Sequence, residues 1–155
     1  MKPLNLIILF IAALVFHSGI SQNLTVFNDQ ELSFGSFYLL GATGGSLSIS
    51  NTGDRTTKGN IQEVNSSSFL VSAFTLSTDS LNPVNITITS SPTTLSNANG
   101  ASMSLEAGIS KPVNPVVQAG DLVKIFIGGT ITVDSEVPAG DYTGELFITF
   151  SIHNE

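Results

Sequence analysis

The feature that most constrains this chain is the two-residue spacing of its apolar side chains. In PVNITIT, Val84, Ile86 and Ile88 alternate with polar residues, which places one set of side chains on a core face and the other toward solvent. Similar short runs cover residues 32–34, 47–49, 69–73, 84–88, 103–105, 123–127, 131–133 and 146–152. Since comparable helical spacing is missing from the sequence, the pattern predicts an all-β protein.

Turn-forming residues separate these runs. They occupy 41–45, 51–54, 79–83, 97–100, 118–121, 128–129 and 138–141. The glycine pairs at 44–45 and 128–129 each precede a short run, and we interpret both as hairpin corners. About eight short strands at this spacing predict an immunoglobulin-like two-sheet antiparallel β-sandwich, with a closed barrel as the main rival. Pro112 and Pro115 predict a loop or edge segment, because proline cannot donate to a sheet.

The N-terminal segment reads as an export signal. Lys2 precedes an apolar run over 6–16, and the small residues Gly19 and Ser21 follow. We therefore expect residues 1–21 to be a signal peptide and 22–155 to be a single β-sandwich domain. The apolar run is shorter than the roughly 20 residues of a comfortable membrane span, although an uncleaved anchor is the alternative. The expected location is periplasmic, cell-surface or extracellular.

Charge and cysteine content narrow the classes of partner. The 155-residue chain contains no cysteine, so neither a disulfide nor a cysteine-linked lipid anchor is available. A domain of 134 residues can bury roughly two-thirds of its unfolded surface without such staples. Four basic and twelve acidic residues follow the signal peptide, a net charge of −8. This charge repels phosphate backbones and anionic membrane surfaces, so we expect no nucleic-acid partner.

The sequence shows no pattern that carries catalytic chemistry. His17 lies in the signal peptide and His153 stands near the C-terminus, so a usual zinc site is not available. Serine is frequent, but GxSxG and SxxK patterns do not occur. The acidic segments 28–31, 79–82 and 134–136 lack the spacing of a dedicated calcium loop. We therefore expect a protein that is not an enzyme and that has no cofactor or bound metal.

The residues of interest are structural. Tyr142 follows the PAGD turn and leads into a strand, where tyrosine often bonds to the backbone at a sandwich corner. We expect glycines to permit turns or close backbone approach and the larger side chains to fill the core. The residues on which we expect the fold to depend are Phe34, Gly35, Phe37, Gly129, Gly140, Tyr142, Gly144, Ile148 and Phe150.

Three segments in order resemble one bacterial family. Residues 32–62 carry an FG-small-aromatic motif, a glycine-rich turn and an NTGD corner, and 86–105 and 127–152 supply a middle and a closing section. Together they resemble the domain-of-unknown-function family DUF4402. That resemblance implies a secreted, immunoglobulin-like β-sandwich of bacterial origin and implies no biochemical activity.

The closing section 127–152 is also similar to fimbrial and spore-coat-type subunits. Many fimbrial subunits are incomplete sandwiches that a neighbour's strand finishes, which is β-strand addition. This chain departs from them because it lacks the disulfide that many of them carry. Leu24 and Val26 alternate in the N-terminal segment, which is either a donor strand or an ordinary first strand of the same domain.

We therefore expect an exported, non-enzymatic structural protein of the bacterial cell surface, fimbria-like or adhesion-related. Its expected partners are like subunits, through self-association or strand exchange. The alternative is an extracellular binding module that recognises a carbohydrate or protein through its end loops, with Asp79 and Asn82 as candidate contacts.

Overall fold

A computed structural model of the chain describes residues 23–41, 43–65 and 67–153. Within these ranges the protein forms twelve β-strands and no helix, so the all-β prediction is confirmed. Accordingly, the described residues include no helix that is long and apolar enough to cross a membrane. The predicted signal peptide, residues 1–21, lies outside the described residues.

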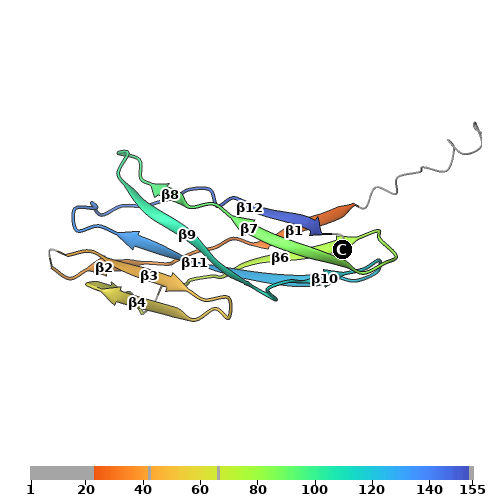
Figure 1. Ribbon diagram of the computed structural model, residues 1–155. Coiled ribbons are helices and arrows are strands. Elements are labelled where there is room, and N and C mark those ends of the chain that lie inside the picture. Colours follow the sequence, from red (N-terminus) through yellow and green to blue (C-terminus); the bar gives the residue numbers. More distant parts are fainter. Residues whose placement is uncertain (1–22, 42, 66, 154–155) are drawn as a thin grey trace, which may run out of the picture.

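The strands and their order are shown in Figure 1. They are β1 (Leu24–Gln30), β2 (Phe37–Leu39), β3 (Gly45–Ile49), β4 (Arg55–Gly59), β5 (Ile61–Glu63), β6 (Ser72–Thr78), β7 (Val84–Ser90), β8 (Thr93–Ser96), β9 (Ser102–Lys111), β10 (Val116–Val117), β11 (Val123–Val133) and β12 (Ile148–His153).

The long strand β11 organises the main sheet. Strand β9 pairs with one edge of β11 from Phe126 to Thr132. Strands β6 and β3 follow one another along its other edge, pairing with 123–127 and 129–133. Strand β1 then lies outside β6, β4 outside β3 and β8 outside β9, all antiparallel. One strand therefore joins both halves of an elongated molecule (Figure 1).

A smaller sheet completes the sandwich-like arrangement. It has the order β10-β7-β12, and β2 and β5 form a separate pair. The rings of Phe74 on β6 and Phe150 on β12 meet edge to face at 5.4 Å between centroids, a favoured aromatic geometry. Two apolar clusters result: one around Leu76, Ile86 and Ile125, and one around Leu47, Ile61 and Ile131. Each draws alternate residues from β11.

The described residues form more strands than the expected eight, because the prediction counted only runs with apolar alternation and several strands have little of it. Strand β4 reads RTTKG, and it exists because its backbone pairs with β3. The run at 32–34 forms only an isolated bridge between Ser33 and Leu70 rather than a strand. The proline-containing segment is a loop ending in the two-residue edge strand β10, as predicted.

The expected hairpin corner at Gly128–Gly129 is wrong. Both glycines lie inside β11, which continues without a turn from Val123 to Val133. A Cβ on Gly128 would lie 1.9 Å from the Ile49 carbonyl oxygen, and one on Gly129 would lie 2.9 Å from a Leu32 methyl carbon. These glycines therefore allow close backbone approach at the crossing where β11 changes partner from β6 to β3.

We predict that Gly128→Ala lowers the free energy of unfolding by about 3 kcal/mol, the upper end of overpacking costs. The added methyl group meets backbone atoms, which cannot move aside as a side-chain end can. Gly140→Ala is the matched control, since a Cβ there has its nearest neighbour at 3.6 Å. Urea unfolding of both variants measures the difference. Equal midpoints for the two variants would contradict the crossing-strand account.

Candidate interaction site

The described residues offer no cluster of side chains for a metal ion. Among them, no group of three or more His, Cys, Asp or Glu side chains is close enough to hold a metal ion. His153 is exposed at the end of β12 and pairs through its backbone with Asn85. The surfaces that stand out among the described residues are two hollows and several exposed apolar side chains.

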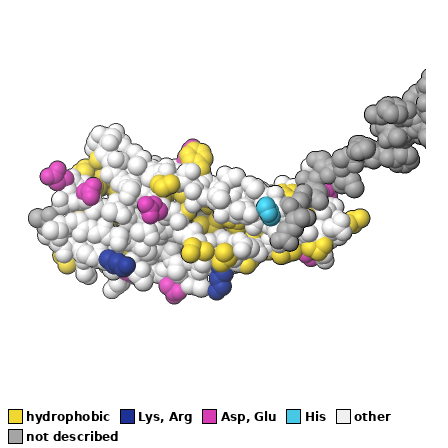
Figure 2. Space-filling view, viewed as in Figure 1, with side chains coloured by type: hydrophobic (Ala, Val, Ile, Leu, Met, Phe, Trp, Pro, Cys, Tyr) yellow, Lys and Arg dark blue, Asp and Glu magenta, His cyan; other side chains and the backbone are white. Residues whose placement is uncertain are grey.

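A cleft lies between β7 and β9, and both aliphatic and polar side chains line it. Its walls come from Thr87–Ser90 on β7 and Ala107–Ser110 on β9, and Ile127 and Ile148 also line it. Its volume is about 310 Å³. Figure 2 shows hydrophobic side chains gathered in the middle of this face, over the area between the two strands in Figure 1.

The cleft is open because its neighbouring strands stop short. Strand β10 pairs only with Val84 and Asn85 of β7, and the Pro115 carbonyl accepts a bond from the Ile86 N–H at 2.9 Å. On the facing wall, β8 pairs with β9 only as far as Leu105. The prolines before β10 cannot donate to a ladder, which keeps this edge short.

The β7 wall carries backbone groups that the described strands do not pair. Because the Ile86 N–H points to the β10 side, alternation directs the N–H and C=O groups of Ile88 and Ser90 to the same side. Both residues lie beyond the end of β10 and line the cleft. The cleft thus combines aliphatic side chains with a free strand edge, two features that a partner chain can use for binding.

A bulge in β9 shapes the other wall. Gly108 and Ile109 stand opposite a single β11 residue, because the register shifts between Ile127 and Gly129. The Asn51 side-chain amide donates to the Ile109 carbonyl at 3.0 Å. The Ile109 side chain is 73% exposed, and Val113 beside it is 59% exposed. The mouth of the cleft therefore has an apolar rim.

A second apolar surface lies at the end of the molecule where loops 79–83 and 118–122 meet. The Ala119 N–H donates to the Ser80 carbonyl at 2.7 Å and joins the loops. Leu81 is 88% exposed and Leu122 is 73% exposed. We call these joined loops the leucine tip. Each of the two joined loops therefore exposes one large aliphatic side chain.

Asp79 of the leucine tip ties the tip to the first strand. Its two carboxylate oxygens accept bonds of 3.0 Å from the Asn23 backbone N–H and side-chain amide. The backbone bond first, and the side-chain bond next, lower the pKa of Asp79 below its ordinary 3.8. A lowered folded-state pKa stabilises the fold above pH 3.8, and this contribution is lost as pH falls through the lowered value.

The closing section forms a hydrogen-bonded corner around Tyr142. Its hydroxyl donates to the Pro138 carbonyl at 2.7 Å and accepts from the Asn97 side-chain amide at 3.1 Å. The Asn97 side-chain oxygen in turn accepts from the backbone N–H groups of Asn99 and Ala101. Tyr142 therefore fastens the corner before β12 to the β8–β9 hairpin.

The other expected structural residues lie in separate parts of the core. Phe34 and Phe37 belong to the cluster around Leu47, and Ile148 and Phe150 to the cluster around Leu76. Gly35 has a φ of 68°, and a Cβ on Gly144 would lie 2.4 Å from the Thr94 carbonyl oxygen. Gly140 lies in the bend before Tyr142, where its φ is not positive and it has room for a side chain.

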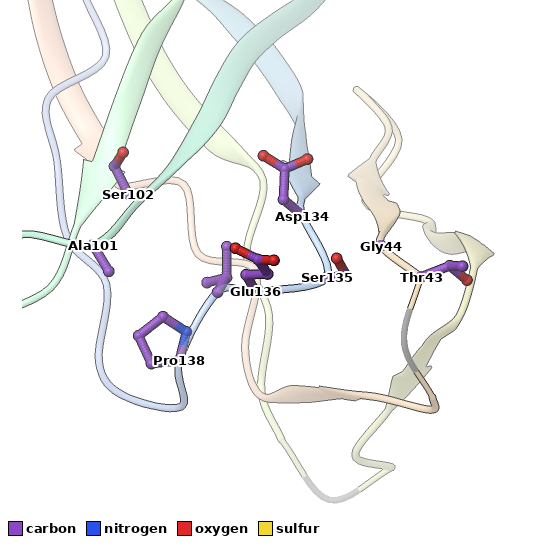
Figure 3. A pocket seen from close by; sticks show the side chains of 9 residues that line it. Thr43, Gly44, Ala101, Ser102, Asp134, Ser135, Glu136 and Pro138 are labelled. Carbon is purple, nitrogen blue, oxygen red and sulfur yellow. The ribbon is translucent and has the colours of Figure 1, made fainter.

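A polar hollow of about 590 Å³ lies among the end loops far from the leucine tip. Figure 3 shows side chains from the loop after β11 around it, including Asp134, Ser135, Glu136 and Pro138. Thr43, Gly44, Ala101 and Ser102 complete its lining. The hollow is open and acidic, so it offers oxygen acceptors for a hydroxyl-rich or cationic group.

Sequence reasoning missed both the cleft and the leucine tip. Thr87–Ser90 read as an ordinary strand, and only its pairing shows that one edge is free. For the leucine tip a signal was available: Leu81 and Leu122 interrupt or follow segments made of turn residues, where large aliphatic side chains are uncommon. Asn82, a predicted contact, is exposed beside Leu81, and Asp79 is engaged with Asn23.

Comparison with known proteins gives a family but no function. A family model described as "Domain of unknown function (DUF4402)" matches residues 24–151, which is most of the chain and nearly the whole described domain. Neither a curated protein nor a solved structure matches the sequence.

Proposed function

We propose that this chain, which belongs to the DUF4402 family, is an exported, non-enzymatic structural protein of the bacterial cell surface that assembles with like subunits. The observation that carries the proposal is the cleft between β7 and β9, where a free strand edge borders aliphatic side chains. Main-chain bonds along such an edge give affinity, and apolar pockets give selectivity.

The N-terminal strand β1 stays in its own domain and is not the strand donated to a neighbouring subunit. Strand β1 pairs with β6 of its own chain from Leu24 to Gln30, as an ordinary first strand does. Its removal to serve a neighbour would break that ladder and the Asn23–Asp79 bonds. We therefore propose association at the cleft rather than exchange of β1. The resemblance of 127–152 to fimbrial subunits supports a fimbria-like or adhesion-related role.

Native mass spectrometry of residues 22–155 tests this function. We expect oligomers whose abundance rises with protein concentration. Ser90→Pro removes the backbone donor that faces the cleft, and it should reduce the oligomer fraction about tenfold. Ser151→Ala on the exposed face of β12 is the control and should assemble normally. A protein that stays monomeric at every concentration and refolds alone would contradict the proposal.

The polar hollow near Glu136 favours a binding module as the second candidate, because end loops converge on it. Its ligand would be a carbohydrate or a protein. This function predicts a saturable ligand in a glycan or surface-protein screen, with binding lost in the Asp134→Asn/Glu136→Gln variant. An empty screen together with a self-assembling protein would exclude it.

A further inference from the structure

The leucine tip and the cleft both present aliphatic side chains. The leucine tip presents Leu81 and Leu122, which are 88% and 73% exposed. The cleft is concave, and Ile127 in its lining is 2% exposed, with Ile109 and Val113 at its rim. An aliphatic knob and an aliphatic hollow on one chain can associate by removing apolar surface from water.

The charges beside the two surfaces also match. Asp79 and Asp121 flank the leucines. The Asp121 carboxylate is partly exposed and accepts a hydrogen bond of 3.3 Å from the Gln118 N–H. Lys111 is exposed and stands between the lining residues Ser110 and Val113 in sequence. Glu106 lies at the opposite end of the β9 wall. An acidic tip would therefore approach from the Lys111 side.

A chain cannot place its own tip in its own cleft. Strand β7 starts at Val84, directly after the leucine tip, and the wall residues 87–90 lie three to six residues further along it. At about 3.3 Å per residue, the extended strand holds the two surfaces roughly 10–20 Å apart. A tip that occupies this cleft must therefore belong to another copy of the chain. The aspartates beside the leucines disfavour contact of the tip with an anionic membrane.

We propose that the leucine tip of one copy seats in the cleft between β7 and β9 of a second copy. This inference rests on the proposed function, because it names the partner and the contact through which subunits assemble. The tip and the cleft are different patches of the surface, so the contact is heterologous. Each added copy therefore leaves one tip and one cleft free for further copies. Such a contact extends into an open chain of subunits unless its rotation closes a ring.

Complementation between two variants tests the contact. Leu81→Ser/Leu122→Ser removes the knob and keeps the cleft, whereas Ile109→Ser/Val113→Ser changes the rim and keeps the knob. All four side chains are mostly exposed, so both variants should fold. We expect each alone to associate at least about tenfold more weakly than the wild type. Mixed at equal concentration, they should form one-to-one heterodimers that do not grow.

Two further variants sharpen the result. Lys111→Glu should weaken association about tenfold by placing like charges at the mouth of the cleft. Leu40→Ser is the matched control, because Leu40 is 51% exposed beside β2 at the other end of the molecule (Figure 1). Sedimentation velocity measures all species. Normal association of Leu40→Ser together with heterodimers from the mixture supports the contact.

The possible outcomes distinguish a failure of the tip-in-cleft contact from a failure of the proposed assembly function. If both double variants assemble like the wild type, assembly proceeds through other surfaces, and the tip-in-cleft contact is wrong while the proposed function stands. If wild-type residues 22–155 remain monomeric at millimolar concentration, the proposed function and this contact fail together. If the knob variant binds neither the rim variant nor wild type, although wild type assembles, the cleft receives something other than this tip.

Discussion

The structure depends on the passage of β11 between its neighbours at Gly128 and Gly129. A single strand there changes partner from β6 to β3 along one edge while β9 follows the other. Side chains at these positions would collide with the Ile49 carbonyl and Leu32, so the strand could not run between both halves of the domain. Because both apolar clusters take residues from β11, the loss of this passage would separate them.

The same arrangement creates the surfaces proposed for assembly. The β9 bulge opposite Gly128 brings Ile109 to the surface, since bulges bend and twist a strand locally. The prolines that follow keep β10 to two residues, which leaves Ile88 and Ser90 at a free edge. Natural sheets usually protect such edges with charge, proline or cover. An uncovered strand edge beside aliphatic side chains is therefore best explained by a partner that covers it.

The sequence predicted the fold class because clean alternation reports a buried face. Strands β3, β7 and β11 follow that alternation, and the turn at 97–100 joins β8 to β9 as expected. Strands β4 and β8 escaped prediction because their stability comes from backbone pairing with a neighbour rather than from apolar spacing. The Gly128–Gly129 error was avoidable: buried residues 125, 127, 131 and 133 keep one parity across the pair, which indicates one continuous strand. The cleft was not predictable from the sequence, because it exists where β10 stops pairing with β7 and β8 stops pairing with β9. No residue pattern marks these two points.

Hydrogen exchange at the Ile88 and Ser90 amides tests most directly whether the cleft is an assembly site. In dilute monomer both amides should exchange much faster than those of Thr87 and Thr89, which face β12 in its ladder. At concentrations where oligomers form, the account predicts that Ile88 and Ser90 become protected, while the exposed Gly100 in the turn between β8 and β9 keeps its exchange rate. Fast exchange of Ile88 and Ser90 in fully assembled protein would contradict it.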